Sequence, residues 1–222
     1  MQTALFIPIK LNNQRLPGKN LMDLNGRPLC SYIFETAAQL DLVDEKYVYC
    51  SDEKIAGYIP HGLHLLKRDP WLDGSSIKGT DIIKHFLRDI FADVYVLTHA
   101  TQPFTRAASI ETALDKVHTE GYDSAFSAVK LQDYCWYQGE PLNYSLDNLI
   151  VTQDLEPVYM ETGAFFIFRR EVFENTGRRI GSRPYMHIVD QFEQIDIDTA
   201  EDFALAQAVA AYLASAPSGV RP

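Results

Sequence analysis

The sequence has few cysteines and no long apolar run, and each shortage excludes a class of protein. Its three cysteines, Cys30, Cys50 and Cys135, are widely spaced and never paired as CxxC, which argues against a disulfide framework or a zinc site. No apolar run approaches the roughly 18 residues of a membrane span, and the first residues lack the basic-then-apolar pattern of a signal peptide. We therefore expect a cytoplasmic protein without a membrane partner.

Basic side chains are also too few for a nucleic-acid-binding protein. Lysine and arginine total 20 against 30 aspartates and glutamates, which gives a formal net charge of -10. Such a chain has no basic face to offset the phosphate charge along a duplex. Nucleic acid is therefore not expected as a partner, and any anionic ligand must be bound by local cations or by a metal ion.

The size and patterning of the chain predict one α/β domain over residues 1–222. A chain of 222 residues with 46% hydrophobic content can bury one sizeable core. Strand-length apolar runs alternate with stretches of helical spacing, and no repeat is evident at a period of roughly 20 to 50 residues. This alternation predicts a mainly parallel, twisted sheet with helices on both faces.

The individual elements follow from the apolar periodicity. Strands are predicted over residues 4–9, 46–50, 63–66, 94–97, 124–129, 165–168 and 195–198. Helices are predicted from about 29 to 40, from a cap at Thr80 or Asp81, from a cap at Thr105 to about Glu120, around 172–173, and from Thr199 onward. Residues 69–79 are predicted to form an irregular polar loop, and residues 214–222 a disordered tail.

The strongest functional signal is the stretch IPIKLNNQRLPGKN, from Ile7 to Asn20. It follows the first predicted strand and places three cations, Lys10, Arg15 and Lys19, in one loop. Pro17-Gly18 fits the two central positions of a type II turn, which would re-aim Lys19. A loop after the first strand is where doubly wound α/β proteins bind phosphates. A solvated surface loop is the alternative.

This stretch resembles the opening motif of the CMP-sugar-acid synthetases, the cytidylyltransferases that activate sialic acids, Kdo and related keto-deoxy acids. Their pattern runs approximately I-P-A-R-x-x-S-x-x-[IL]-P-G-K-N, and Ile7, Pro8 and residues 16–20 match it. Lys10 replaces the usual arginine and Asn13 the usual serine. Lysine keeps the charge but lacks the planar fork that contacts two phosphate oxygens at once.

Asp196 and Asp198 are the second half of the predicted site. In a strand, residues two apart project to the same face, so both carboxylates would point one way. Paired carboxylates suit Mg²⁺, which completes its shell with water and substrate phosphates. Alternatively, Asp198 could simply lie at a helix start, where the helix dipole favours an acid. The stretch IDIDTAEDF resembles the family's closing motif, whose aspartates are metal ligands.

The middle of the chain matches the family more loosely. Arg68 follows the third strand in a basic pair with a nearby leucine and aspartate, although a solvated cation would look the same. His99 and Gln102 lie in a loop that resembles the family's sugar-facing loop, and a lone histidine is more often structural. Glu161 precedes Gly163 at a position expected to contact the sugar. The arginines at 178, 179 and 183 are expected to face solvent or an interface.

The segment from about 130 to 161 is predicted to be an inserted arm. It is rich in aromatic residues, lacks a helical period and reads as hairpins or extended arms. Such aromatics outside a core pattern favour a buried partner surface, and in the resembling family this insertion pairs two subunits. A homodimer is therefore expected, with a decorated loop over the chain's own core as the alternative.

The resemblance implies a Rossmann-like nucleotidyltransferase that is Mg²⁺-dependent. The 2-hydroxyl of a keto-deoxy sugar acid would attack the α-phosphate of CTP, giving a CMP-sugar acid and pyrophosphate. The implied nucleotide contacts are Lys10, Asn12, Asn13, Arg15, Lys19, Asn20 and Arg68; Lys19, Arg15 and Asp198 are catalytic, Asp196 and Asp198 hold the metal, and His99, Gln102 and Glu161 contact the sugar. Two alternatives remain: another sugar nucleotidyltransferase, or a catalytically silent nucleotide-binding homologue, for which the departures at Lys10, Asn13 and Val151 leave room.

Overall fold

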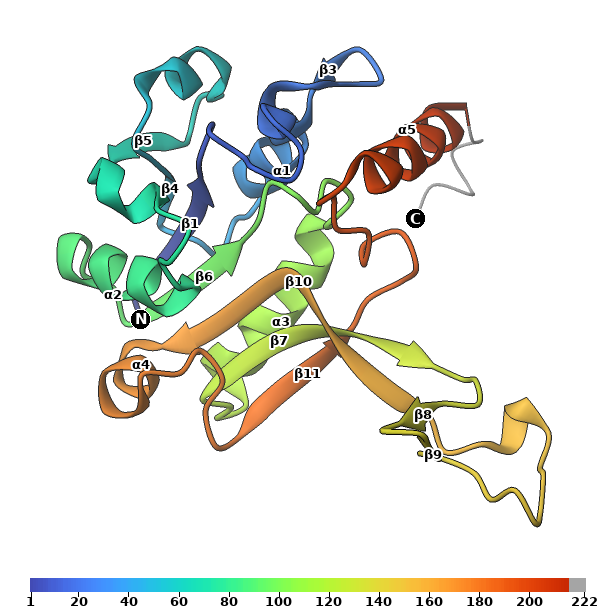
Figure 1. The fold of residues 1–222 in the computed structure, drawn as a ribbon. Helices are drawn as coiled ribbons and strands as arrows, with labels where there is room; N and C mark the ends of the chain where they lie inside the picture. Colours follow the sequence, from blue (N-terminus) through green and yellow to red (C-terminus); the bar gives the residue numbers. More distant parts are fainter. Residues whose placement is uncertain (216–222) are drawn as a thin grey trace.

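A computed structural model describes residues 1–215 and contains a seven-stranded sheet (Figure 1). The strand order is β11-β7-β10-β6-β1-β4-β5. The strands are β1 (Thr3–Ile9), β4 (Glu45–Cys50), β5 (His64–Lys67), β6 (Val94–Thr98), β7 (Ser124–Leu131), β10 (Val158–Arg169) and β11 (Pro184–Ile188). Two small hairpins pair β2 (Asp23–Leu24) with β3 (Arg27–Pro28), and β8 (Trp136–Tyr137) with β9 (Glu140–Pro141).

The helices connect these strands in the expected alternation. They are α1 (Leu29–Ala38), α2 (Gly79–Asp89), α3 (Ala107–Thr119), α4 (Arg170–Thr176) and α5 (Ala200–Ser215). Short 3-10 turns are η1 (Lys19–Leu21), η2 (Glu53–Tyr58), η3 (Pro70–Asp73) and η4 (Thr152–Asp154). Within residues 1–215, no helix combines the length and the apolar character that crossing a membrane requires.

The sheet is mainly parallel, as predicted, with one antiparallel exception. β1 runs parallel to β4 and β6, β4 to β5, and β7 to β11. β10 is antiparallel to both of its neighbours, β6 and β7. The polypeptide leaves β7 and returns as β10 without a helical crossover, and only antiparallel strands can be joined in that way.

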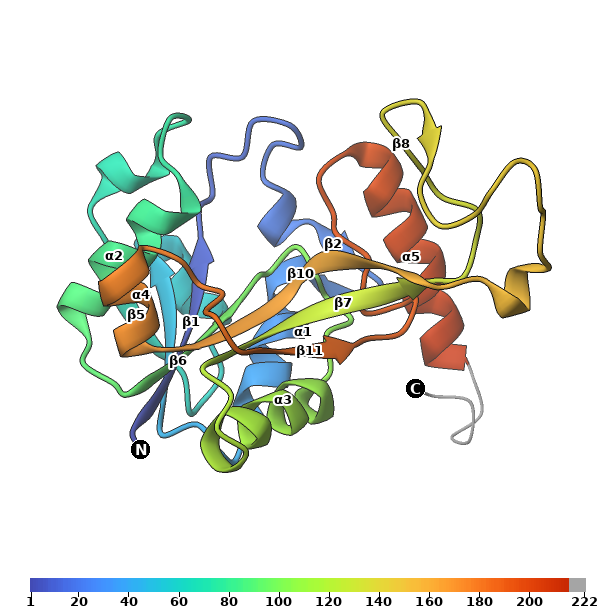
Figure 2. The same cartoon turned by 90° about the horizontal axis from the view of Figure 1, so that it is seen from below.

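Helices cover both faces of the sheet, which explains the continuous apolar run of β1. Leu5 and Ile7 pack with α1 and α3 on one face, whereas Phe6 packs with α2 and α4 on the other. The Phe6 ring stacks on Phe86 of α2 at 4.1 Å between centroids. Figure 2 shows α3 and α4 on opposite sides of the sheet. The predicted fold class is confirmed.

Two predicted helix caps are wrong. Helix α2 begins after Lys78, and Asp81 accepts a hydrogen bond from the Lys78 backbone N–H at 2.9 Å. Helix α3 begins after Arg106, because the hydroxyl of Thr105 donates to the Gln102 carbonyl instead. The free N–H of Arg106 donates to the carboxylate of Glu193, at 2.9 Å. The polar loop at 69–79 also contains one regular turn, η3.

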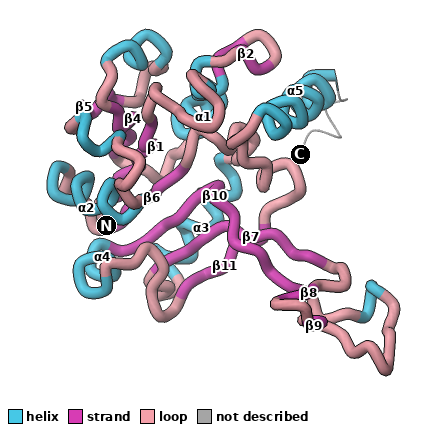
Figure 3. Tube along the Cα trace, in the orientation of Figure 1, coloured by secondary structure: helices cyan, strands magenta, loops and turns pink. Residues whose placement is uncertain are grey.

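The predicted strand at 195–198 is also wrong. Figure 3 shows the connection from β11 to α5 as loop throughout. Ile197 is fully buried, and its N–H donates to the Thr101 carbonyl at 2.8 Å, but no strand runs beside it. The alternation of apolar and acidic residues therefore reflects one-sided burial without strand pairing. Helix α5 continues through Ser215, so the predicted tail begins too early at 214, and residues 216–222 lie outside the described part.

The segment between β7 and β10 extends away from the body of the protein (Figure 1). The two strands continue as an antiparallel ribbon to the pair Leu131 and Val158 and then give way to the β8–β9 hairpin and a long loop. Its large side chains are exposed, with Trp136 at 55% and Tyr137 at 63%. The segment has the expected extended form, and its role in pairing subunits stays a prediction.

Candidate active site

A cleft lies at the carboxyl-terminal edge of the parallel strands. A pocket of about 200 Å³ there is lined by Lys10 after β1, Arg68 after β5, His99 after β6, Gly79 at the start of α2, and Arg179. Loops that follow neighbouring parallel strands meet at this edge of a sheet, which is where α/β proteins bind ligands. The fold therefore brings together Lys10, Arg68 and His99, three residues predicted from distant parts of the chain.

The opening loop forms the predicted type II turn. Gly18 has φ 70 and ψ 11, and the Lys19 N–H donates to the Leu16 carbonyl at 3.2 Å. The turn leads directly into η1, so the Lys19 side chain points inward and is only 8% exposed. Its Nζ donates to the Ile197 carbonyl at 2.5 Å and contacts Asp198 Oδ1 at 2.9 Å. Lys19 therefore joins the opening loop to the closing loop.

Asp198 binds two cations of the opening loop. Its second oxygen contacts Arg15 NH1 at 2.8 Å, and Arg15 is 71% exposed. Asp198 does not cap α5, since Thr199 and Asp202 do so reciprocally: the Thr199 N–H donates to Asp202 at 2.8 Å, and the Asp202 N–H donates to the Thr199 hydroxyl. The geometry thus disfavours the interpretation of Asp198 as a helix-start acid.

The residues predicted to hold a metal offer two carboxylates on an irregular loop. Asp196 is exposed and forms no ion pair within residues 1–215, whereas both oxygens of Asp198 are engaged. No cluster of three or more acidic, histidine or cysteine ligands occurs in the described chain. Mg²⁺ needs only one or two carboxylates when phosphates and water complete its shell. The donor set therefore fits Mg²⁺ that arrives with a nucleotide, provided that Arg15 leaves Asp198.

The asparagines of the opening loop differ in their surroundings. Asn20 is buried and donates from Nδ2 to the Lys10 carbonyl at 2.8 Å, which fixes the loop. The Oδ1 atoms of Asn20 and Asn13 are buried without a hydrogen-bond partner among residues 1–215, whereas Asn12 is exposed. Lys10 reaches the Asp73 carbonyl at 3.5 Å. Buried acceptors without partners are unfavourable, so these two oxygens are available to a donor on a ligand.

Arg68 is a buried cation, so its interpretation as a solvated surface residue is wrong. Its side chain is 2% exposed, and NH2 contacts Asp73 Oδ1 at 2.6 Å. Asp73 also accepts a hydrogen bond from the Ser51 hydroxyl, which helps to orient it. The remaining guanidinium nitrogens, Nε and NH1, are buried and have no hydrogen-bond partner in the part of the chain that the structure describes. Arg68 therefore presents two unused donors beside the cleft.

His99 is oriented by the backbone of β10. Its Nδ1 lies 2.7 Å from the Gly163 carbonyl, which can only accept, so this nitrogen carries the proton. Nε2 has no hydrogen-bond partner among residues 1–215 and keeps its lone pair. Burial lowers the His99 pKa from 6.5, and the nearby charge of Arg179 lowers it further, against the opposing effects of the Gly163 hydrogen bond and Asp196. His99 is thus neutral near pH 7.

Gln102 packs against the same stretch of β10. It is 2% exposed, and its Oε1 has no hydrogen-bond partner from the described residues, 1–215. A Cβ at Gly163 would lie 2.9 Å from Gln102 Nε2, so a larger residue there would force Gln102 to move. Gly163 lies within the register shift of β10 between Glu161 and Phe166. The bulge and the glycine together allow the loop after β6 to approach β10 closely.

Arg179 lies on the cleft wall with its side chain 35% exposed, so it borders the cleft as well as the solvent that it is expected to face. Its guanidinium carbon lies 3.5 Å from the centre of the Phe166 ring, and NH2 contacts Glu161 Oε1 at 3.1 Å. Arg178 is exposed and Arg183 lies over the Tyr122 ring. Adjacent arginines look alike in sequence, and only the path of the backbone after α4 separates them.

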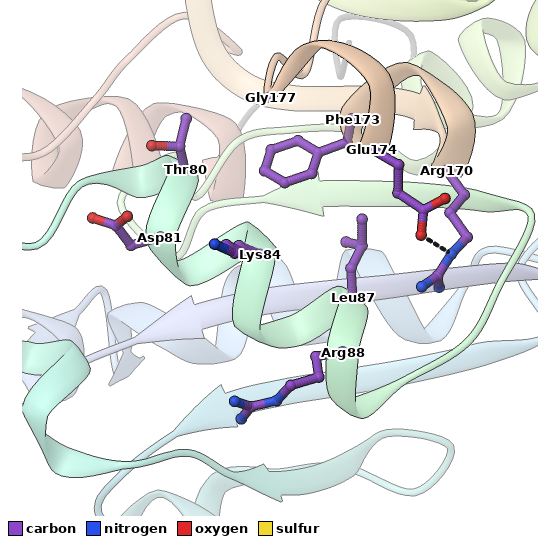
Figure 4. Close-up of a pocket in the computed structure, with 9 residues that line it drawn as sticks. All are labelled: Thr80, Asp81, Lys84, Leu87, Arg88, Arg170, Phe173, Glu174 and Gly177. Atoms are coloured by element: carbon purple, nitrogen blue, oxygen red, sulfur yellow. Dashed lines mark hydrogen bonds and ion pairs between the residues drawn. The ribbon is translucent and has the colours of Figure 1, made fainter.

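A larger pocket of about 650 Å³ lies between α2 and α4 (Figure 4). Lys84 and Arg88 of α2 face Arg170 and Glu174 of α4 across it, and Arg170 and Glu174 pair with each other at 2.7 Å. None of the site residues predicted from the sequence lines this pocket. We therefore place the candidate site in the smaller cleft.

The fold and the cleft define an α/β protein with cations at the carboxyl edge of its sheet, where proteins of this class bind ligands. The family model described as cytidylyltransferase matches residues 4–215, and the chain belongs to this family. It is 26% identical over 214 residues to the N-acylneuraminate cytidylyltransferase of Streptococcus agalactiae serotype V, covering 91% of this chain and 52% of that protein. The chain thus spans about half the length of that relative.

Two further proteins are similar over nearly their whole length. The CMP-N,N'-diacetyllegionaminic acid synthase of Legionella pneumophila subsp. pneumophila is 27% identical, with 93% of this chain and 95% of that protein covered. A solved structure of CMP:2-keto-3-deoxy-manno-octonic acid synthetase complexed with CTP superposes with a TM-score of 0.71 at 18% identity, covering 95% and 99% of the two chains. The last likeness establishes the fold alone.

Proposed function

We propose that this protein transfers a cytidylyl group from CTP to a keto-deoxy sugar acid, giving a CMP-sugar acid and pyrophosphate. The observation that carries the proposal is the cluster of Lys19, Arg15 and Asp198, because it joins the two motifs that the chain shares with its family. A buried lysine held between two loops is a preorganised cation for a transferring phosphate. Family membership and the sugar-acid relatives support the proposed substrates.

The reaction forms a bond from the 2-hydroxyl oxygen of the acid to the α-phosphorus, and breaks the bond from that phosphorus to the pyrophosphate oxygen. Such a displacement needs positioning and charge neutralisation more than a covalent catalyst. Lys10, Arg15 and Lys19 bind the triphosphate, with Lys19 nearest the charge that develops. Asn12, Asn13, Asn20 and Arg68 position the nucleotide, and the unpartnered atoms of Asn13, Asn20 and Arg68 are the available contacts.

Asp196 and Asp198, from the loop before α5, would hold Mg²⁺ when the nucleotide binds. A bound divalent ion neutralises phosphate charge and lowers the pKa of an attacking hydroxyl. Arg15 is exposed and can transfer from Asp198 to the phosphates without reorganising the core. Lys19 stays fixed by the Ile197 carbonyl and keeps the carboxylate aimed at the opening loop.

The acid binds beside the loop after β6. His99 offers a neutral ring nitrogen as acceptor for a sugar hydroxyl, and Gln102 has a free Oε1. Glu161, in β10 at the start of its register shift, lies on the same side of the cleft through its pairing with Arg179. His99 and Gln102 lie in the loop after β6, and Glu161 lies in β10, which pairs with β6, so we infer that a single ligand contacts all three.

The arm between β7 and β10 pairs two copies of the chain. Its exposed aromatic and aliphatic side chains include Trp136, Tyr137, Leu142, Leu146 and Leu149, and such patches are unusual on monomers. Sedimentation at micromolar concentration should give a dimer, and Trp136→Glu should weaken it. Trp71→Glu is the matched control, since Trp71 is 48% exposed but lies on η3. If the protein sedimented only as a monomer, the proposed pairing of two copies through the arm would be contradicted.

The activity itself is tested by pyrophosphate release. The protein is incubated with CTP, Mg²⁺ and, in turn, N-acylneuraminate, N,N'-diacetyllegionaminate or 2-keto-3-deoxy-manno-octonate. We expect release with at least one acid, with CTP preferred over ATP, GTP and UTP, and loss on chelation of the metal. Equal use of ATP or GTP would indicate a different nucleotidyltransferase. Binding of CTP without turnover of any acid would favour a catalytically silent homologue.

A further inference from the structure

The loop from Gly177 to Arg183 is unusually well fixed for an exposed connection. Asp123 accepts hydrogen bonds from the backbone N–H groups of Ser182 and Arg183, at 2.8 and 3.0 Å, and also from the Ser182 hydroxyl. A Cβ added at Gly181 would lie 2.4 Å from the Asp123 carboxylate, so only glycine fits there. The backbone that carries Arg179 is therefore held against the start of β7.

The Arg179 side chain is preorganised but only partly used. Its guanidinium stacks on Phe166, an arrangement that fixes the plane of the group. NH2 contacts Glu161, while Nε and NH1 have no hydrogen-bond partner within the described chain. The pair is accessible, with the side chains 35% and 44% exposed. Ion pairs this exposed contribute little to stability, so a ligand can displace Glu161 easily.

Arg179 stands where the nucleotide cleft meets a second hollow. It lines the 200 Å³ pocket together with His99, and with Gly79 and Ile83 it also borders a neighbouring hollow of about 480 Å³. It comes from the loop after α4, whereas the cations assigned to phosphates follow β1 and β5. Arg179 is thus a separate cation on the side of the cleft where His99 and Glu161 lie.

We propose that Arg179 binds the carboxylate of the sugar acid, and that Glu161 is its counter-ion when the acid is absent. The assignment rests on the proposed function for the identity of the acid. A planar guanidinium contacts both oxygens of a carboxylate at once, which a lysine cannot do. Arg179 is a specificity-determining residue, because a substrate that lacks the carboxylate leaves its donors unpaired.

Equilibrium binding tests this role without requiring turnover. The affinities of wild type, Arg179→Gln, Arg179→Lys and Arg183→Gln are measured by calorimetry for N-acylneuraminate and for its methyl ester, in the presence of CTP and Ca²⁺. Arg183 is the matched control, since it lies on the same loop but contacts the Tyr122 ring instead of the cleft. Thermal melting of each variant checks folding.

Wild type should bind the acid more tightly than the ester. Arg179→Gln should abolish that difference by lowering the affinity for the acid roughly ten- to a hundredfold. The affinity for CTP should change less than about threefold. Arg179→Lys should be intermediate and Arg183→Gln unchanged. The assignment would be overturned if Arg179→Gln kept the wild-type ratio of acid affinity to ester affinity. It would also be overturned if the variant lost affinity for CTP and not for the acid.

The proposed function fails separately. If wild type distinguishes acid from ester through Arg179 but releases no pyrophosphate with any acid, the carboxylate site stands and the catalytic proposal falls. If pyrophosphate is released and Arg179→Gln leaves the KM for the acid unchanged, the catalytic proposal stands and the carboxylate-binding role of Arg179 falls. If none of the three acids binds or is turned over, both are wrong.

Discussion

Two ion pairs flank the cleft, and they differ in burial. Lys19 and Asp198 join the opening and closing loops, with Lys19 only 8% exposed. Arg179, after α4, pairs with Glu161 of β10, and both side chains are more than a third exposed, at 35% and 44%. Removing one partner of a buried ion pair lowers the free energy of unfolding strongly, whereas an exposed ion pair exchanges partners readily. The comparison separates a fixed element of the site from an exchangeable one.

Lys19→Ala should have the largest effect. It removes the cation nearest the transferring phosphate and takes the Lys19 donor from Asp198 Oδ1 and from the Ile197 carbonyl, while Arg15 still contacts Asp198 Oδ2. Turnover should fall by more than about a hundredfold, and the free energy of unfolding by about 1–3 kcal/mol. Pyrophosphate release and a melting curve measure the two effects. Lys54→Ala, at an exposed lysine of η2, is the control, and normal turnover of Lys19→Ala would refute the phosphate role.

Asp198→Asn should have the second-largest effect, a loss of turnover of roughly a hundredfold. Asparagine keeps the shape and one oxygen but removes the charge that Mg²⁺ and both cations need. The same change at the exposed, unpaired Asp196 should be milder. Turnover measured across Mg²⁺ concentrations, beside thermal melting, distinguishes a metal ligand from a purely structural acid. Normal turnover of Asp198→Asn at limiting Mg²⁺ would overturn the metal assignment.

His99 should contribute a smaller, pH-dependent effect. Burial lowers its pKa in the folded state below the usual 6.5, so the unfolded chain binds the proton more readily. Stability should therefore fall as the pH drops below about 6.5, and should continue to fall until the folded-state pKa is reached. His99→Asn should show a shallower decline than wild type in denaturant titrations between pH 7 and 5. Parallel curves would assign the dependence to His118 or His187, whose pKa values burial also lowers.

Glu161→Gln should have the smallest effect on stability, because its ion pair is exposed. The free energy of unfolding should change by less than about 1 kcal/mol. Glutamine can still hydrogen-bond a sugar hydroxyl, and the substitution frees Arg179, so the affinity for the acid should be unchanged or slightly higher. Calorimetry on this variant tests that expectation: a large loss of acid affinity would mean that the sugar needs the Glu161 carboxylate itself and that Glu161 is not simply the counter-ion of Arg179.

Much of the fold was readable from local pattern. The apolar run of β1, the helical spacing of α1 and α5 and the Pro17-Gly18 turn each depend on neighbours in the chain. The errors fall where a contact distant in sequence replaces a local one. Arg106 receives its cap from Glu193, and Ile197 in the 195–198 segment is buried against α5 and the loop after β6 without pairing as a strand.

The sequence by itself determined the charge balance, the α/β class, the phosphate-loop motif and the residues Lys10, Lys19 and Asp198, because each is a local pattern or a composition. Only the tertiary structure decided that Lys19 lies between two loops and that Arg68 is buried. It also decided that Arg179, in place of Arg178 or Arg183, reaches the cleft. Those outcomes depend on which distant groups share a desolvated space, and the direction of a backbone after α4 is set by Asp123 and Gly181, not by the arginines themselves.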